Sequence, residues 1–159
     1  MTSNFSEGPT ATGPRLLVVE DSDEDFEAIS RVLRKLGVTM PVQRCADGDE
    51  CLEVLGCTSD LPLAMTPEPL PSLILLDLNL PGTDGRDVLR AIKGNSRLKS
   101  IPVTVLTTSA SPRDVRACYG YGANAYVLKP VDFNLFAERL RSIAEFWLNI
   151  AVQPLAPPI

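Results

Sequence analysis

The chain has 159 residues, a net charge of −5 and a sequence pI near 4.7, and 45% of its residues are apolar. This length and composition are typical of one globular domain that buries enough surface to fold without disulfides. The acidic charge argues against binding to nucleic acid, which requires a basic face. No run approaches the ~18 apolar residues of a membrane span, and the N-terminus lacks signal-peptide features, so we expect a cytoplasmic protein with no membrane segment.

Short apolar segments alternate with helical patterns along the chain. Strands are expected over 15–19, 41–45, 72–76, 101–106 and 125–128. Helices are expected from a cap at Ser22 or Asp23 to Gly37, over 47–55, over about 84–93, from Ser111–Pro112 to Gly120, and from Asp132 to about Ile150. Residues 1–14 are interpreted as a disordered leader, 15–150 as one folded domain and 151–159 as a tail. The four prolines within 56–72 predict a mobile surface insertion.

Strands that alternate with helices indicate an α/β fold with a parallel sheet covered on both faces. Burial on both faces explains why the strands are continuously apolar. The four cysteines form no CxxC pair and the chain has no histidine, so we expect reduced thiols and no zinc site.

Polar side chains follow the predicted strands at the point where each one ends. Glu20 and Asp21 follow the first strand, Asp77 the third, Thr107 the fourth and Lys129 the fifth. The carboxyl ends of parallel strands meet at one edge of a sheet, where α/β proteins bind ligands. We therefore expect these five side chains to lie together.

Carboxylates held close together repel one another, and a hard divalent cation relieves that repulsion. The residues therefore predict a Mg²⁺ site, with Asp77 as a candidate nucleophile for phosphoryl transfer beside Lys129 and a hydroxyl. Each residue also has a simpler interpretation: Asp77 as a turn cap, Glu20 and Asp21 as helix caps, and Lys129 as a surface charge.

Four segments, "VVED", "LLDLNLPGTDG", "VLTTSA" and "YVLKP", together resemble a response-regulator receiver domain over about residues 15–148. The resemblance implies a flavodoxin-like, doubly wound five-stranded parallel sheet of order 2-1-3-4-5 with five helices. It also implies that the protein signals rather than turning over a substrate, with at most intrinsic autophosphatase activity.

The resemblance implies that Asp77 accepts a phosphoryl group from the phosphohistidine of a sensor histidine kinase. Asp21, Asp77 and the Asn79 carbonyl would ligate Mg²⁺, and Glu20 would act through a bound water. Lys129 would contact the phosphoryl group, and the bond before the following proline would be cis.

Two further residues would form the switch. Thr107 would hydrogen-bond the phosphoryl oxygen and Tyr126 would swing inward behind it, so that phosphorylation alters a protein-interaction or dimer face. Ser109 and Asn79 would flank the site and tune dephosphorylation.

The motifs "LLDLNLP" and "VLTTS", the proline-rich insertion and "SIAEFWL" resemble those of single-domain regulators partnered with phytochrome-type histidine kinases. The chain ends without an output domain, so we expect neither a DNA-binding domain nor a second chemistry.

The last predicted helix carries apolar residues that could contact a second copy of the chain. Phe133, Phe136, Leu140, Ile143 and Trp147 recur at helical spacing and are expected in the core. Phe146 and Ile150 lie on another side. With Trp147 they are candidates for a homodimer contact, which the resemblance supports.

Three other classes of protein do not fit the residues of this chain. An EF-hand starting at Asp21 would need glycine where Phe26 stands, and the GxGxxA match at 120–125 closes a helix rather than opening one. A phosphatase or transferase would need a substrate pocket and a separate general acid. A degenerate receiver that acts as a scaffold or phosphate sink stays open as the alternative.

Overall fold

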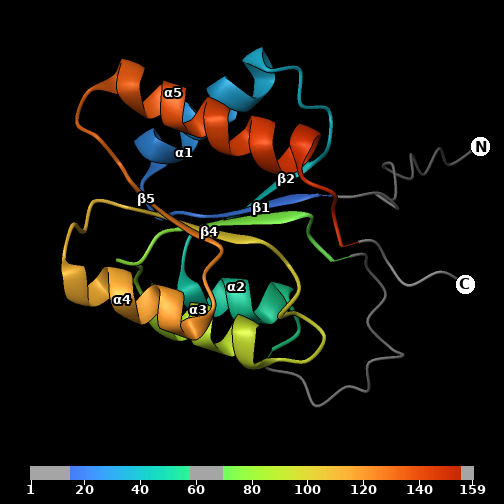
Figure 1. The fold of residues 1–159 in the computed structure, drawn as a ribbon, viewed down its shortest axis with the longest axis vertical. Coiled ribbons are helices and arrows are strands. Elements are labelled where there is room, and N and C mark those ends of the chain that lie inside the picture. Colours follow the sequence, from blue (N-terminus) through green and yellow to red (C-terminus); the bar gives the residue numbers. More distant parts are fainter. Residues whose placement is uncertain (1–14, 58–69, 155–159) are drawn as a thin grey trace, which may run out of the picture.

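The computed structural model describes residues 15–57 and 70–154. The expected leader 1–14, most of the proline-rich insertion and the end of the tail lie outside these residues. The described part contains a sheet of five parallel strands in the order β2-β1-β3-β4-β5 (Figure 1). The predicted sheet and its order are therefore confirmed.

The five strands are short and begin and end within three residues of their predicted bounds. They are β1 Leu16–Val19, β2 Val42–Cys45, β3 Leu73–Leu76, β4 Val103–Thr107 and β5 Ala125–Leu128. The three central strands are fully buried, which explains their unbroken apolar sequences. The edge strands β2 and β5 are only partly buried, so the prediction of full burial holds for the centre of the sheet and not for its edges.

Five helices cover the two faces of the sheet: α1 Asp23–Lys35, α2 Gly48–Val54, α3 Gly85–Gly94, α4 Pro112–Tyr121 and α5 Phe133–Ala144. Figure 1 shows α1 and α5 on one face and α2, α3 and α4 on the other. Successive strand residues point to opposite faces, so each central strand contributes to two apolar clusters. Leu17 and Val19 pack with α2 and α3, whereas Leu16 and Val18 pack with α1 and α5.

Side-chain caps begin three of the helices where the sequence predicts them. Ser22 accepts a hydrogen bond from the Asp25 amide at 3.2 Å, Ser111 caps α4 ahead of Pro112, and Asp132 caps α5. The end of α4 differs from the prediction. The helix continues past Gly120 to Tyr121 and is closed by Gly122, whose φ of 106° is left-handed.

The last helix continues as predicted to Ile150, but its final part, Glu145–Ile150, is π-helical. The Ala151 amide donates to the Phe146 carbonyl at 2.6 Å, five residues back. Within the described residues, no helix combines the length and apolar character needed to cross a bilayer.

Four of the five residues predicted for the core face of the last helix pack inward: Phe136, Leu140, Ile143 and Trp147. Phe133 does not, and the expectation for it is wrong. It is 49% exposed because it is the first residue of α5 and lines an open hollow with Val131 and the start of α1.

Candidate functional site

The polar residues that follow the strands are fixed by main-chain hydrogen bonds that extend the sheet pairing. The Asp77 amide donates to the Val19 carbonyl at 3.0 Å, and the Lys129 amide donates to the Thr107 carbonyl at 2.7 Å. Each residue is thus placed by the strand beside it as well as by its own strand. The carboxyl edge of the sheet brings Glu20, Asp21, Asp77 and Lys129 together, as predicted from the sequence, and Thr107 adjoins them through its main chain.

Three carboxylates meet at this edge. Glu20, Asp21 and Asp77 each place one oxygen within 4.8 Å of the others. Glu20 and Asp77 are buried, with 2% and 7% of their surface exposed, whereas Asp21 is exposed. The cluster is therefore open to solvent on the side of Asp21.

The ammonium group of Lys129 lies among the carboxylates. Its Nζ is 2.5 Å from Glu20 Oε2, 2.9 Å from Asp25 Oδ2 and 3.0 Å from Asp77 Oδ2, and the lysine side chain is 7% exposed. Burial alone would lower the pKa of Lys129, but its hydrogen bonds to Glu20 and Asp25 outweigh burial and raise that pKa above the ordinary value. Lys129 is therefore held as a cation.

Glu20 is the carboxylate most affected by its surroundings. Burial raises its pKa from 4.5 to about 7, although the hydrogen bond from Lys129 opposes that rise. Its Oε1 also accepts a hydrogen bond from the Ser22 amide at 3.0 Å. The Lys129 ammonium group contacts three carboxylates, those of Glu20, Asp25 and Asp77, and Asp21 adds a fourth carboxylate to the cluster. The excess of negative charge on oxygen donors fits a hard divalent cation.

The two oxygens of Asp77 have different partners. Oδ1 accepts a hydrogen bond from the Leu78 amide at 2.7 Å, and Oδ2 accepts one from Lys129. Two residues further on, Asn79 is exposed, and its carbonyl accepts no hydrogen bond from the described residues. Its role as a metal ligand, which the resemblance to receivers implies, stays a prediction.

Thr107, the last residue of β4, is fully buried, and its hydroxyl oxygen accepts a hydrogen bond from the Ser109 amide at 3.3 Å. Ser109 is held through its other polar atoms as well. Its carbonyl accepts a hydrogen bond from the Tyr126 hydroxyl at 2.8 Å, and its own hydroxyl donates to Asp114 Oδ2 at 2.6 Å. The two predicted switch residues, Thr107 and Tyr126, are therefore joined through the β4–α4 loop, residues 108–111.

An arginine on α3 binds Asp114, the α4 residue that accepts the hydrogen bond from Ser109. Arg86, in the first turn of α3, donates from Nε and Nη2 to the two oxygens of Asp114 at 2.8 and 2.7 Å. The same guanidinium donates to Asp84 at 3.1 Å. Hydrogen bonds from Arg86 and Ser109 lower the pKa of Asp114 from 3.8 to about 2.

Comparison with known proteins agrees with this geometry. A family model described as the response regulator receiver domain matches residues 16–141. The chain belongs to this family.

Several named relatives of this receiver resemble it over most of their length. Rcp1 from Synechocystis is 38% identical over 141 residues, which cover 89% of this chain and 93% of Rcp1. A probable methanogenesis regulatory protein, FilR2 from Methanothrix harundinacea, is 38% identical over 134 residues, 84% of this chain and 83% of FilR2.

Solved structures of receivers show the same fold. The phosphorylated cyanobacterial phytochrome response regulator RcpA superposes with a TM-score of 0.80 at 36% identity, over 89% of this chain and 99% of RcpA. The Mn²⁺-bound form of Rcp1 superposes with a TM-score of 0.81 at 36% identity, over 90% of this chain and all of Rcp1. The receiver described here therefore resembles phytochrome response regulators over nearly their whole length.

One expectation for this receiver is wrong. The described residues contain no cis peptide bond, so the bond between Lys129 and Pro130 is trans. The trans form is the one that most X–Pro bonds adopt, and with it Lys129 contacts the carboxylates of Glu20, Asp25 and Asp77.

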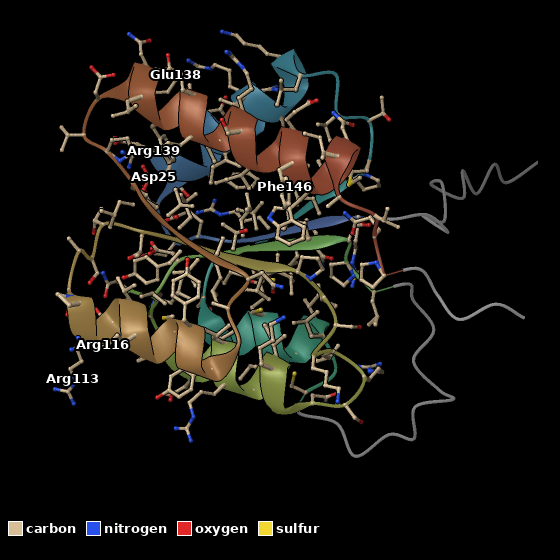
Figure 2. The ribbon with its side chains drawn as sticks, in the orientation of Figure 1. Asp25, Arg113, Arg116, Glu138, Arg139 and Phe146 are labelled. Carbon is tan, nitrogen blue, oxygen red and sulfur yellow. The ribbon has the colours of Figure 1, made fainter. Side chains whose placement is uncertain are left out.

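The candidates for a dimer contact lie on the last helix of the receiver. Phe146 and Ile150 are 47% and 65% exposed, as predicted, and Phe146 is labelled on the C-terminal half of that helix in Figure 2. Trp147 is half-buried against the α1 and α5 side of the core, and its ring meets that of Phe146 edge-on at a centroid distance of 5.0 Å.

Sequence reasoning missed Asp25 as a partner of Lys129. Asp25 lies in the first turn of α1, which begins two residues after Asp21, so a side chain one turn into the helix reaches the same edge (Figure 2). Acidic residues are common in the first turn of a helix because the helix dipole favours negative charge there. Nothing in the sequence therefore distinguishes Asp25 from an ordinary first-turn acid.

Arg86 was missed as well, although a signal for it exists. A cation in the first turn of a helix opposes the helix dipole, which suggests a partner elsewhere in the fold. Sequence alone does not say which acid that partner is.

Proposed function

We propose that this receiver acts in two-component signalling and that Asp77 accepts a phosphoryl group from a partner histidine kinase. One observation carries the proposal. The Asp77 carboxylate lies 3.0 Å from the Lys129 ammonium and within 4.8 Å of oxygens of Glu20 and Asp21, at the edge where the strands end. Carboxylate, ammonium and a cluster of oxygen ligands are the parts that phosphoryl transfer to an aspartate requires.

The oxygen donors fit Mg²⁺. Asp21, Asp77 and the Asn79 carbonyl would hold the ion directly, and Glu20 would do so through a water. When bound, Mg²⁺ supplies neutralisation of the negative charge on the phosphoryl oxygens. The excess of carboxylates over the Lys129 cation supports this assignment.

In the proposed reaction, an oxygen of the Asp77 carboxylate forms a bond to phosphorus while the bond from phosphorus to the partner's histidine nitrogen breaks. The histidine keeps the electron pair of that bond and leaves as a neutral imidazole, because its other ring nitrogen carries a proton in the phosphohistidine. Leu78 holds the other Asp77 oxygen with its amide at 2.7 Å, which orients the attacking carboxylate. Lys129 would exchange one of its carboxylate partners for a phosphoryl oxygen.

Thr107 would couple the phosphoryl group to the rest of the fold. Its hydroxyl oxygen already accepts the Ser109 amide, so its own proton is free to be donated to a phosphoryl oxygen. A shift of Thr107 towards phosphorus would pull on Ser109 and release the hydroxyl of Tyr126. We propose that this movement alters the face formed by α4, β5 and α5.

The proposal is tested by incubating the chain with acetyl phosphate and Mg²⁺ and measuring its intact mass. We expect the wild type to gain one phosphoryl group that hydroxylamine removes, because it is an acyl phosphate. Asp77→Asn should gain none. The matched control is Asp87→Asn, a change of an exposed carboxylate in the first turn of α3 that should be phosphorylated like the wild type.

Phosphorylation of Asp77→Asn to the same extent as the wild type would overturn the assignment. A wild type that takes up no phosphoryl group with Mg²⁺ present would favour the alternative of a scaffold. If the phosphoryl group has no effect on any partner, the chain would act as a phosphate sink.

The partner kinase is proposed to be of the phytochrome type, acting in the cytoplasm. Support comes from the likeness to solved structures of phytochrome and bacteriophytochrome response regulators. We further propose that residues 15–150 form the working receiver unit and that two copies pair through the C-terminal half of the last helix. Phe146 and Ile150, both exposed, and the half-buried Trp147 supply the apolar surface for that contact.

A further inference from the structure

The β1–α1 loop consists of three residues, Glu20, Asp21 and Ser22, and carries two of the three clustered carboxylates. The Glu20 side chain is fixed by the Ser22 amide and by Lys129. The Asp21 side chain is exposed and receives no hydrogen bond from the described residues. Its direction is therefore set by the main chain of the loop.

Arg44, on the edge strand β2, holds that main chain. Its Nε donates to the Glu20 carbonyl at 3.1 Å, and its Nη2 donates to the Asp21 carbonyl at 3.3 Å. Two successive carbonyl groups are thus bound by one planar group. Because the guanidinium is a rigid fork, it fixes the relative orientation of the two peptide planes on either side of Asp21.

The guanidinium is itself held in place from two sides. Its Nη1 lies 2.8 Å from Asp23 Oδ1, and its central carbon lies 4.9 Å from the centre of the Phe26 ring. The Asp23 side chain is 91% exposed, so that ion pair contributes little. The stacking on Phe26, which packs against the core, is the contact that sets the plane of Arg44.

We propose that Arg44 is a positioning residue for the cation site, and that it acts by fixing the main chain from which Asp21 reaches a bound Mg²⁺. This inference rests on the proposed function of the carboxylate cluster. A lysine at this position would keep the positive charge but could not bind both carbonyls in one plane. The charge and the fork of Arg44 can therefore be separated by experiment.

The first measurement is the Mg²⁺ dissociation constant, obtained by calorimetric titration of the full chain. We expect Arg44→Lys to raise it about tenfold, the size of effect typical of residues that orient a metal ligand. Arg34→Lys is the matched control, because among the described residues the Arg34 side chain pairs only with Glu27, on the outer side of α1. It should bind Mg²⁺ as the wild type does.

The second measurement needs no metal. Amide hydrogen exchange of residues 20–22 should be faster in metal-free Arg44→Lys than in the wild type, while exchange in the central strands is unchanged. If Arg44→Lys fails to fold, Phe26→Leu removes the stacking surface and should give the same two changes on a smaller scale.

The outcomes separate this inference from the proposed function. A wild type that does not bind Mg²⁺ overturns both. A wild type that binds Mg²⁺, together with a folded Arg44→Lys that binds within twofold of it and shows unchanged exchange in the loop, overturns the role of Arg44 alone. Weaker binding with faster exchange confined to the loop supports it.

Discussion

Replacing Asp114 by asparagine tests the ion pair that joins the first turn of α4 to α3. The carboxylate accepts two hydrogen bonds from Arg86 and one from the Ser109 hydroxyl. Asparagine has nearly the same shape but carries no charge. Any loss of stability therefore reports the charge of Asp114 rather than its volume.

The size of the effect follows from the pKa of Asp114. A fall from 3.8 to about 2 corresponds to about 2.4 kcal/mol of stability at 1.36 kcal/mol per pH unit. The side chains of Asp114 and Arg86 are 19% and 28% exposed, so solvent screening reduces this value. We expect the free energy of unfolding of Asp114→Asn to be about 1 to 1.5 kcal/mol below that of the wild type at pH 7.

The pH dependence gives the sharper test. Because the pKa of Asp114 is lower in the folded chain than in the unfolded chain, its contribution is present above pH 3.8 and is lost as the pH falls through about 2. The difference between wild type and Asp114→Asn should therefore shrink to about half of its neutral value at pH 3. Urea denaturation followed by circular dichroism, from pH 7 to pH 3, measures it.

Asp87→Asn is the control for this prediction. Asp87 is in the first turn of α3, as Asp114 is in the first turn of α4, but it makes no ion pair within the described residues. It should lose only the small dipole contribution of about 0.5 kcal/mol. An equal loss in the two variants, or a loss in Asp114→Asn that stays constant down to pH 3, would refute the reasoning.

Two further predictions concern packing and assembly. Gly48→Ala should lower the free energy of unfolding by about 2 to 3 kcal/mol, because the new Cβ would lie 1.9 Å from a main-chain oxygen of the β3–α3 loop. Gly120→Ala should raise the free energy of unfolding by about 0.5 to 1 kcal/mol, because no atom lies within 4 Å of the new Cβ. Chemical denaturation of both variants measures the two changes. Changes of the same sign in the two variants would contradict the prediction. The double change Phe146→Ala and Ile150→Ala should shift the protein towards monomer in light scattering, whereas Tyr119→Ala, 50% exposed on α4, should not. An unchanged mass in the double variant would count against the proposed contact.

The sequence predicts the carboxyl edge well because strand ends are local features. Each of Glu20, Asp77 and Lys129 follows an apolar run directly, and parallel pairing then brings the runs together. The order of the strands is not local, and it came with the resemblance to receivers rather than from the residues themselves. The helix caps at Ser22 and Asp132 were also predictable, since a cap depends on only the next three residues.

The long side chains were less predictable. Arg44 and Arg86 each reach groups on another element, and their partners depend on how helices pack on the sheet. Phe133 fits the helical spacing of core residues, but it is the first residue of α5 and lines an open hollow, so its ring is half exposed. Spacing identifies the face of a helix and does not say how far along the helix the core extends.

The ion pair between Lys129 and Glu20 has a consequence for the synthesis of the chain. The two residues are 109 positions apart in the sequence, and closing so long a segment carries an entropic cost that only the assembled sheet offsets. A nascent chain therefore cannot present the complete carboxylate and lysine arrangement until the fifth strand has left the ribosome. Chains truncated before the fifth strand should therefore be inert towards phosphoryl donors.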